Sequence, residues 1–205
     1  MEKKTIHYLA LGDSYTIGEA VPAAHNFPNL LFQMANEEGI AMEKPRIIAT
    51  TGWTTDELMK GIEIADEETP IGQDHDLVSL LAGVNDQYRG RPLEEYKENF
   101  RSLVQKALEF AGGNKEKLVI LSIPDWGVTP FAEGRDRQQI SKGIDAFNEA
   151  AESIAKNEQI HYIYITDWTR EAATRPELLA SDGLHPSALE YERWSREILR
   201  YLKKL

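Results

Sequence analysis

Residues 9–16 have the sequence Leu-Ala-Leu-Gly-Asp-Ser-Tyr-Thr, in which an apolar segment ends at a glycine and a serine follows. The apolar run from Ile6 to Leu11 predicts a buried strand. Open α/β sheets bind ligands beyond the carboxyl ends of their strands, which is where Ser14 would lie. A helix beginning there would stabilise developing negative charge through its free N–H groups. Gly-Asp-Ser is equally typical of a turn with a helix N-cap, so these residues alone leave Ser14 with either a catalytic or a structural role.

The rest of the chain alternates strand-like and helix-like segments. Further strands are predicted over residues 46–50, 77–82, 117–123 and 161–165, and helices over 27–38, 54–65, 92–110, 136–157 and 187–202. Thr54 or Thr55 is the predicted N-cap of its helix, and Ser187 with Glu190 predicts a capping box. Five strands separated by helices predict an α/β fold with a parallel sheet between two helical layers, in one domain of residues 1–205.

Composition excludes several classes of protein. The formal net charge of −11 disfavours nucleic acid and anionic membranes as partners. No apolar run approaches the roughly 18 residues of a membrane span. The absence of cysteine excludes disulfides, thiolate metal sites and a cysteine nucleophile. The first residues contain no apolar leader segment, so we expect a cytoplasmic protein unless a signal segment has been removed.

A serine nucleophile needs a general base, and the chain has five histidines. His7 and His161 fall within predicted strands, which favours structural roles. His25 lies in a loop with no carboxylate nearby in sequence, and His75 lies between two aspartates in what we expect to be a solvated turn. Only His185 lies in a short loop, Ser-Asp-Gly-Leu-His-Pro, directly before the final predicted helix. His185 is therefore the strongest candidate for the base.

The spacing of this loop suggests a partner for His185. Gly183 permits a sharp turn, so the carboxylate of Asp182 can reach one imidazole nitrogen and leave the other free to accept a proton from Ser14. The structural alternative is an exposed Asp-Gly turn beside an unrelated histidine, and Asp-x-x-His is a weak signal by itself.

Two other strand ends supply candidate donors for an oxyanion. Residues 80–86, Leu-Leu-Ala-Gly-Val-Asn-Asp, would place the Asn85 amide at the same sheet edge as Ser14. Residues 50–53, Thr-Thr-Gly-Trp, contain Gly52, whose N–H could approach a bound oxygen. With the Ser14 N–H, these groups would form a three-donor oxyanion hole. Taken alone, Asn85 is more typical of a loop-capping residue.

Together these four segments resemble the GDSL, or SGNH, family of hydrolases, named after a serine, glycine, asparagine and histidine. The resemblance spans residues 9–186, and it implies a flavodoxin-like three-layer α/β/α sandwich that hydrolyses esters or thioesters without a metal or cofactor. It implies that Ser14 is the nucleophile, His185 the base and Asp182 the residue that orients it. It also implies that the Ser14 N–H, Gly52 and Asn85 form the oxyanion hole. Around Gly52 this chain lacks the asparagine and second glycine that the family often has there.

Substrate contacts are predicted from the aromatic residues near these strand ends. The segment 123–131 follows a predicted strand and should line a pocket, and the candidate contacts are Tyr15, Trp53, Tyr88, Trp126 and Phe131. Trp53 could equally be a packing aromatic. Proteins of the family that this chain resembles include arylesterases, thioesterases, lysophospholipases and carbohydrate O-acetyl esterases. The chain has no long apolar lid segment, which favours short-chain or small soluble esters.

Two hypotheses from other classes compete with a serine esterase. Gly12-Asp13 and Asn85-Asp86 could supply carboxylate ligands to a metal-dependent phosphoesterase, although such sites normally need several histidines as well. A binding module without catalysis is the other alternative, and it is disfavoured because every chemical role has a candidate residue.

Overall fold

The structure, a computed structural model, describes residues 4–205 and contains a five-stranded sheet whose neighbouring strands all pair in parallel. The strand order is β2-β1-β3-β4-β5. The strands are β1 (Tyr8–Gly12), β2 (Arg46–Ala49), β3 (Leu77–Leu80), β4 (Leu118–Leu121) and β5 (His161–Ile163). Each predicted strand is confirmed, with its ends shifted by a few residues at most.

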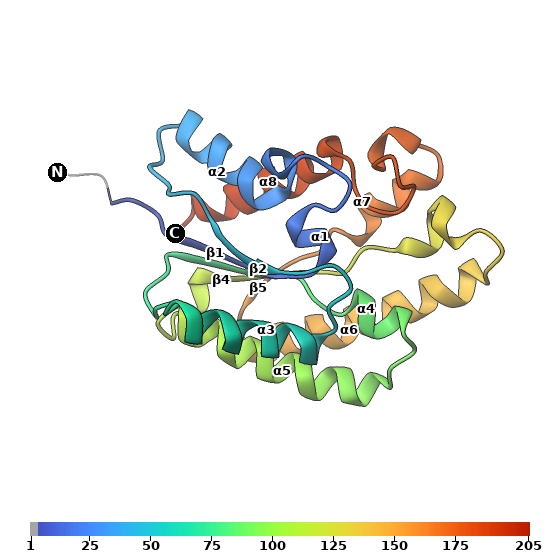
Figure 1. The fold of residues 1–205 in the computed structure, drawn as a ribbon, viewed down its shortest axis with the longest axis horizontal. Helices are drawn as coiled ribbons and strands as arrows, with labels where there is room; N and C mark the ends of the chain where they lie inside the picture. Colours follow the sequence, from blue (N-terminus) through green and yellow to red (C-terminus); the bar gives the residue numbers. More distant parts are fainter. Residues whose placement is uncertain (1–3) are drawn as a thin grey trace.

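Helices cover both faces of the sheet, which confirms the predicted three-layer sandwich (Figure 1). On one face lie α2 (Phe27–Glu37) and α8 (Ala188–Leu202), and on the other lie α3 (Thr55–Glu68), α5 (Leu93–Phe110) and α6 (Arg137–Glu158). Three short helices, α1 (Ser14–Ile17), α4 (Val84–Tyr88) and α7 (Thr166–Arg170), follow the carboxyl ends of β1, β3 and β5. None of the helices within residues 4–205 is long and apolar enough to cross a membrane.

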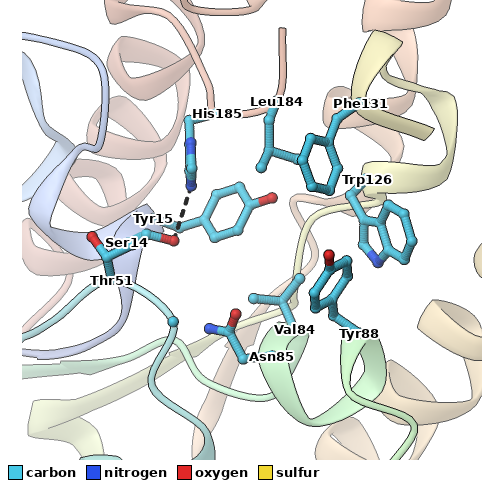
Figure 2. A pocket seen from close by; sticks show the side chains of 11 residues that line it. Ser14, Tyr15, Thr51, Val84, Asn85, Tyr88, Trp126, Phe131, Leu184 and His185 are labelled. Carbon is cyan, nitrogen blue, oxygen red and sulfur yellow. Dashed lines mark hydrogen bonds between the residues drawn. The ribbon is translucent and has the colours of Figure 1, made fainter. Parts of the chain in front are cut away.

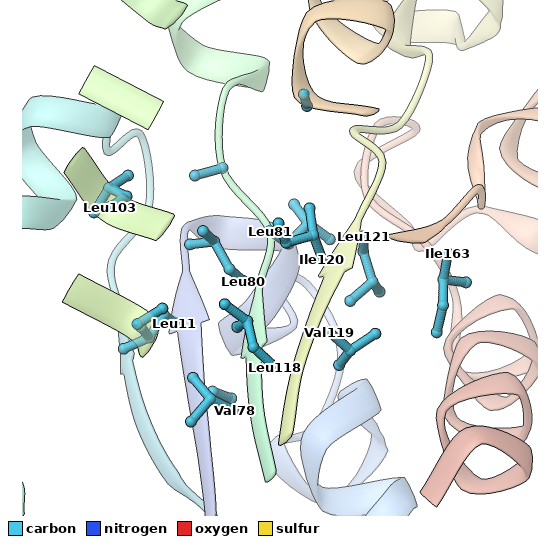
Figure 3. Close-up of a cluster of buried hydrophobic side chains, with 14 of the residues drawn as sticks. Leu11, Val78, Leu80, Leu81, Leu103, Leu118, Val119, Ile120, Leu121 and Ile163 are labelled. Atoms are coloured by element: carbon cyan, nitrogen blue, oxygen red, sulfur yellow. The ribbon is translucent and has the colours of Figure 1, made fainter. Parts of the chain in front are cut away.

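The core is centred on β3 and β4, in which every residue is buried. Because helices cover both faces, these strands need apolar side chains on both sides, and their sequences are almost continuously aliphatic. Figure 3 shows side chains of both strands packed with Leu11 of β1 and Leu103 of α5. Burying one such leucine contributes about 1.5–3 kcal/mol to the folded state. The strand ends that hold the candidate site residues are thereby fixed.

The two predicted helix starts have different outcomes. Thr54 is the N-cap of α3, and its N–H donates to the Glu57 carboxylate at 3.0 Å, as in a capping box. The capping box predicted at Ser187 is wrong, because the Ser187 hydroxyl donates to the Glu177 carbonyl instead. The carboxylate of Glu190 accepts hydrogen bonds from neighbouring side chains of α8. A carbonyl outside the helix and side chains of the helix itself have replaced the pairing that the sequence pattern suggested.

The strand order creates a crevice beside β1. The chain passes from β1 outward to β2 and then returns to pair β3 with the other side of β1. Ligands in open α/β sheets bind at such a switch point, beyond the carboxyl ends of the two strands. Ser14 follows β1 at this point, and Asn85 follows β3 in α4. Gly83 makes the turn into α4 with φ +127°, and a Cβ there would lie 2.6 Å from the Tyr96 ring.

Candidate active site

Ser14 is the first residue of α1 and is 4% exposed. Asp13 caps this helix by accepting a hydrogen bond from the Tyr15 N–H at 3.0 Å. The turn is tight, since a Cβ on Gly12 would lie 2.1 Å from the Thr16 hydroxyl and 2.7 Å from the Leu81 carbonyl oxygen. The turn therefore requires glycine at position 12 and places the Ser14 hydroxyl at the wall of a cavity.

Ser14, His185 and Asp182 form a continuous hydrogen-bonded series. Figure 2 shows its first hydrogen bond, between Ser14 and His185. The His185 Nε2 lies 2.9 Å from the Ser14 Oγ, and the His185 Nδ1 lies 2.6 Å from an Asp182 carboxylate oxygen. Burial raises the pKa of Asp182, but hydrogen bonds from the His185 ring and from the N–H groups of Leu184 and His185 outweigh this effect. The pKa of Asp182 is therefore below its ordinary value, and the carboxylate is ionised beside the imidazole at neutral pH.

A hairpin-like loop holds His185 in this position. The N–H groups of Leu184 and His185 both donate to one Asp182 oxygen, each at 3.0 Å. The Ala180 N–H donates to the His185 carbonyl at 2.8 Å, and Leu179 and Pro186 form an antiparallel bridge. Gly183 turns the loop with φ +66°, as its place in the sequence predicted. The imidazole is thus positioned before any substrate binds.

The three predicted oxyanion donors meet at the same cavity. Within residues 4–205, neither the Ser14 N–H nor the Gly52 N–H has a hydrogen-bond partner. Gly52 adopts φ +83°, and its carbonyl accepts a hydrogen bond from Arg89 at 2.6 Å. The Asn85 amide donates to the Trp53 carbonyl at 2.9 Å and to the Asp13 carboxylate at 3.2 Å. These two acceptors therefore fix the orientation of the Asn85 side-chain amide.

Two buried acids lie behind these donors. Burial raises the pKa of Asp13 to about 7, against hydrogen bonds from Tyr15 and Asn85 that lower it, and the neighbouring Asp86 raises it further. Burial also raises the pKa of Asp86, which accepts hydrogen bonds from the Thr55 hydroxyl at 2.7 Å and the Thr55 N–H at 2.9 Å. Both carboxyl groups therefore accept hydrogen bonds from other groups of the protein. In the described part of the chain, no three His, Asp or Glu side chains cluster closely enough to hold a metal ion.

Aromatic side chains form the opposite wall of the cavity, which has a volume of about 140 Å³ and is partly open to solvent. The rings of Tyr88, Trp126 and Phe131 contact one another, with centroids 5.2 to 6.1 Å apart. The Tyr15 ring packs against the His185 imidazole at 4.9 Å. Four of the five predicted substrate contacts therefore line one cavity with Ser14 (Figure 2).

The fifth predicted contact, Trp53, does not line this cavity. Its ring packs against Gly61 of α3, where a Cβ would lie 2.0 Å from the ring. Only the Trp53 carbonyl reaches the site, through Asn85. Because Gly61 has no side chain, it leaves a gap on α3 that the Trp53 ring fills. This packing joins the helix to the loop before it, and the residues next to Trp53 in sequence do not reveal it.

Other sequence predictions near the site also need revision. Thr51, Val84 and Leu184 line the cavity although we did not predict them. Each adjoins a predicted site residue in sequence, which was the available signal. His75 is not a solvated turn residue, because it is 8% exposed and its Nδ1 lies 3.3 Å from the Phe110 carbonyl.

Comparison with known proteins places the chain in a family. The sequence profile of the GDSL-like lipase/acylhydrolase family matches residues 10–193, which is most of the chain. The chain belongs to this family. An arylesterase from Vibrio mimicus is 25% identical over 191 residues, which cover 93% of this chain and 84% of that protein. This GDSL-family protein is therefore an ester-hydrolysing enzyme.

Solved structures of other proteins share the fold. A lipolytic protein of this family from Veillonella parvula is 18% identical, with a TM-score of 0.74 over 98% of this chain and 100% of that one. An acetylxylan esterase from Geobacillus stearothermophilus is 20% identical, with a TM-score of 0.72 over 98% of this chain and 96% of that one. At these identities the likeness concerns the fold.

Proposed function

We propose that this enzyme hydrolyses small or short-chain carboxylic esters or thioesters, with Ser14 as nucleophile, and that residues 1–205 act as one catalytic domain. The observation that supports this most directly is the hydrogen-bonded series from the Ser14 hydroxyl through His185 to Asp182. A weak hydroxyl nucleophile needs an adjacent base, and that base needs a third group to orient it. The 2.9 Å and 2.6 Å contacts satisfy both requirements.

In the first half of the reaction, His185 Nε2 removes the proton of the Ser14 hydroxyl as its oxygen attacks the acyl carbonyl carbon. The ionised Asp182 keeps the Nδ1 proton in place and stabilises the imidazolium that forms. His185 then donates its Nε2 proton to the leaving alcohol or thiol, and the acyl group stays on Ser14 as an ester.

The negative charge that develops on the carbonyl oxygen would be met by the Ser14 N–H, the Gly52 N–H and the Asn85 amide. The two backbone donors are free of partners within residues 4–205, so they can bind this oxygen without breaking a hydrogen bond. Asn85 would exchange its longer hydrogen bond, the 3.2 Å contact with Asp13, for the oxyanion. One such donor typically contributes about 2.7–4 kcal/mol of transition-state stabilisation.

In the second half, water attacks the Ser14 acyl ester with His185 again as the base. The carboxylic acid leaves, and Ser14 regains its proton. Besides the substrate and one water molecule, these steps use side chains and N–H groups of this chain. The partly open cavity of about 140 Å³ suits a small ester, and its aromatic wall suits an aryl group or the face of a sugar ring. One similar sequence is named an arylesterase, which agrees with an aryl group, and one similar structure is that of an acetylxylan esterase, which agrees with a sugar ring.

The test is loss of p-nitrophenyl acetate hydrolysis in Ser14→Ala, which should lower kcat by at least about 10⁴-fold. A fluorophosphonate probe should label Ser14 in the unmodified enzyme, as located by peptide mass spectrometry. Ser102→Ala, at an exposed serine of α5, is the matched control and should keep full activity.

Full activity of Ser14→Ala would overturn the proposal. Activity that disappears with a chelator while the serine probe does not react would instead support the metal-dependent phosphoesterase.

A further inference from the structure

Tyr15 places a hydroxyl without a partner in the cavity. Its side chain is 3% exposed, and within residues 4–205 the hydroxyl makes no hydrogen bond. Figure 2 shows this hydroxyl pointing away from Ser14, toward Leu184 and Phe131. Desolvation raises the pKa of Tyr15, and the nearby Asp13 and Asp182 raise it further, so the phenol keeps its proton and remains a donor.

The position of this hydroxyl distinguishes it from the fully buried unpaired hydroxyls within residues 4–205. Those of Thr16 and Tyr191 also lack partners, but both are fully enclosed and cannot meet a substrate. The Tyr15 side chain lines the cavity, and its ring packs on the His185 imidazole at 4.9 Å. A group bound beside the reacting carbonyl would therefore lie against this hydroxyl.

Tyr88 adds a second hydroxyl to the part of the cavity that the Tyr15 hydroxyl faces. We call this part, between Tyr15, Tyr88, Leu184 and Phe131, the compartment. Figure 2 shows its hydroxyl directed into the cavity from α4. The guanidinium of Arg135 lies 5.2 Å from the Tyr88 ring centroid and donates a hydrogen bond to the Tyr88 oxygen at 3.3 Å. Because that oxygen already accepts, the Tyr88 proton is available to a ligand. The remaining wall is apolar, formed by Val84, Leu184 and two aromatic rings.

We propose that Tyr15, assisted by Tyr88, selects esters whose group in this compartment carries a hydrogen-bonding oxygen. This inference rests on the proposed esterase function of Ser14. An alkyl group there would remove water from the Tyr15 hydroxyl and leave a buried donor unpaired, which is unfavourable. An ether or hydroxyl oxygen would accept from it. Sites built to pair a substrate oxygen discriminate strongly against analogues that lack it.

The experiment compares substrates that differ only by replacing a methylene or methyl with oxygen. On the alcohol side these are 2-hydroxyethyl acetate and propyl acetate, and on the acyl side p-nitrophenyl methoxyacetate and p-nitrophenyl butyrate. The ratio of kcat/KM within each pair is measured in the unmodified enzyme and in Tyr15→Phe. Intrinsic reactivity differences cancel when the two enzymes are compared.

We expect Tyr15→Phe to lower the ratio of oxygenated to alkyl substrate by about tenfold in one of the two pairs, and that pair identifies the group that occupies the compartment. Tyr88→Phe should lower the ratio of the same pair by a smaller factor. Tyr164→Phe, at an exposed tyrosine outside the cavity, is the matched control and should leave both ratios unchanged. An unchanged thermal unfolding midpoint in Tyr15→Phe would show that packing is intact.

Ratios within about twofold of the unmodified enzyme in both pairs would overturn the role of Tyr15. The proposed function is tested separately, because Ser14→Ala abolishes hydrolysis of all four esters whatever the ratio. An enzyme that needs Ser14 but shows no change of ratio in Tyr15→Phe would remain a serine esterase with a different basis for specificity.

Discussion

The two walls of the cavity are built in different ways. On the side of the sheet edge, the polar groups of Asp13, Asn85, Asp182 and His185 have hydrogen-bond partners at defined distances. On the aromatic side, Tyr88 and Phe131 are 42% and 41% exposed and contact each other mainly through ring faces and edges. We refer to these as the polar wall and the aromatic wall.

This difference separates two requirements of an enzyme. A reaction through a charged intermediate needs donors and bases held within fractions of an ångström, which buried hydrogen bonds provide. Recognition of a substrate needs contact area that adapts to its shape, which partly exposed aromatic rings provide. We therefore expect substitutions in the polar wall to act on kcat and substitutions in the aromatic wall to act on KM.

The largest effect should come from His185→Ala, which removes the proposed base from the polar wall. Without it the Ser14 hydroxyl cannot be deprotonated efficiently, so kcat for p-nitrophenyl acetate should fall about 10⁵- to 10⁶-fold with little change in KM. His25→Ala, at an exposed histidine outside the site, is the matched control. A loss of less than about tenfold would remove His185 from the chemistry.

Asn85→Ala should have the next largest effect. It removes one proposed oxyanion donor together with its hydrogen bonds to Asp13 and the Trp53 carbonyl. We expect kcat to fall about 10²- to 10³-fold, since the lost interaction exists mainly in the transition state. Asn157→Ala, at an exposed asparagine of α6, should have no effect. A rise in KM without a fall in kcat would place Asn85 in substrate binding instead.

The polar wall should also make stability depend on pH through Asp13. Its pKa is raised to about 7 in the folded protein by burial, so the folded state holds this proton more tightly than the unfolded state does. As pH rises from the ordinary carboxyl value to about 7, the unfolded chain releases the proton first and folding becomes less favourable. The contribution of Asp13 to folding stability is therefore lost as pH rises. Asp182 behaves in the opposite way, because its lowered pKa makes folding more favourable at higher pH.

The measurement compares the free energy of unfolding of the unmodified protein and Asp13→Asn across pH. Between roughly pH 5 and pH 8 the unmodified protein should lose about 2–3 kcal/mol relative to the variant. The pKa of Asp86 is also raised, but Asp86 is present in both proteins, so the difference between their curves comes from Asp13 and its interaction with Asp86. Parallel stability curves would show that Asp13 titrates normally and is not desolvated.

The sequence predicts residues of both walls, because these residues lie in segments that follow strand ends. Gly12, Gly83 and Gly183 mark turns directly beside Ser14, Asn85 and the Asp182–His185 pair, so local pattern and strand order suffice to bring these groups to one sheet edge. Trp53 shows the limit of this reasoning. Its place beside Gly52 suggested a cavity residue, but the gap above Gly61 on another element determined where the ring packs.

The same limit explains Ser187 and His75. A capping box and a solvated turn were reasonable from neighbouring residues, but the Glu177 and Phe110 carbonyls, supplied by other segments, determined both environments. Positions that depend on backbone turns at strand ends were therefore predictable. Environments that depend on which side chain or carbonyl of a distant element arrives nearby were not.

The smallest effect, and the sharpest contrast with Asn85, is expected for Phe131→Ala in the aromatic wall. The ring is partly exposed and contacts Tyr88 and Trp126, so its loss removes contact area without disturbing the hydrogen bonds around Ser14. We expect kcat/KM for p-nitrophenyl acetate to fall by up to about tenfold, mainly through KM. Phe131→Leu should recover part of the loss. A fall in kcat comparable to that of Asn85→Ala would mean that the aromatic wall positions the reacting groups, and the division between the two walls would not hold.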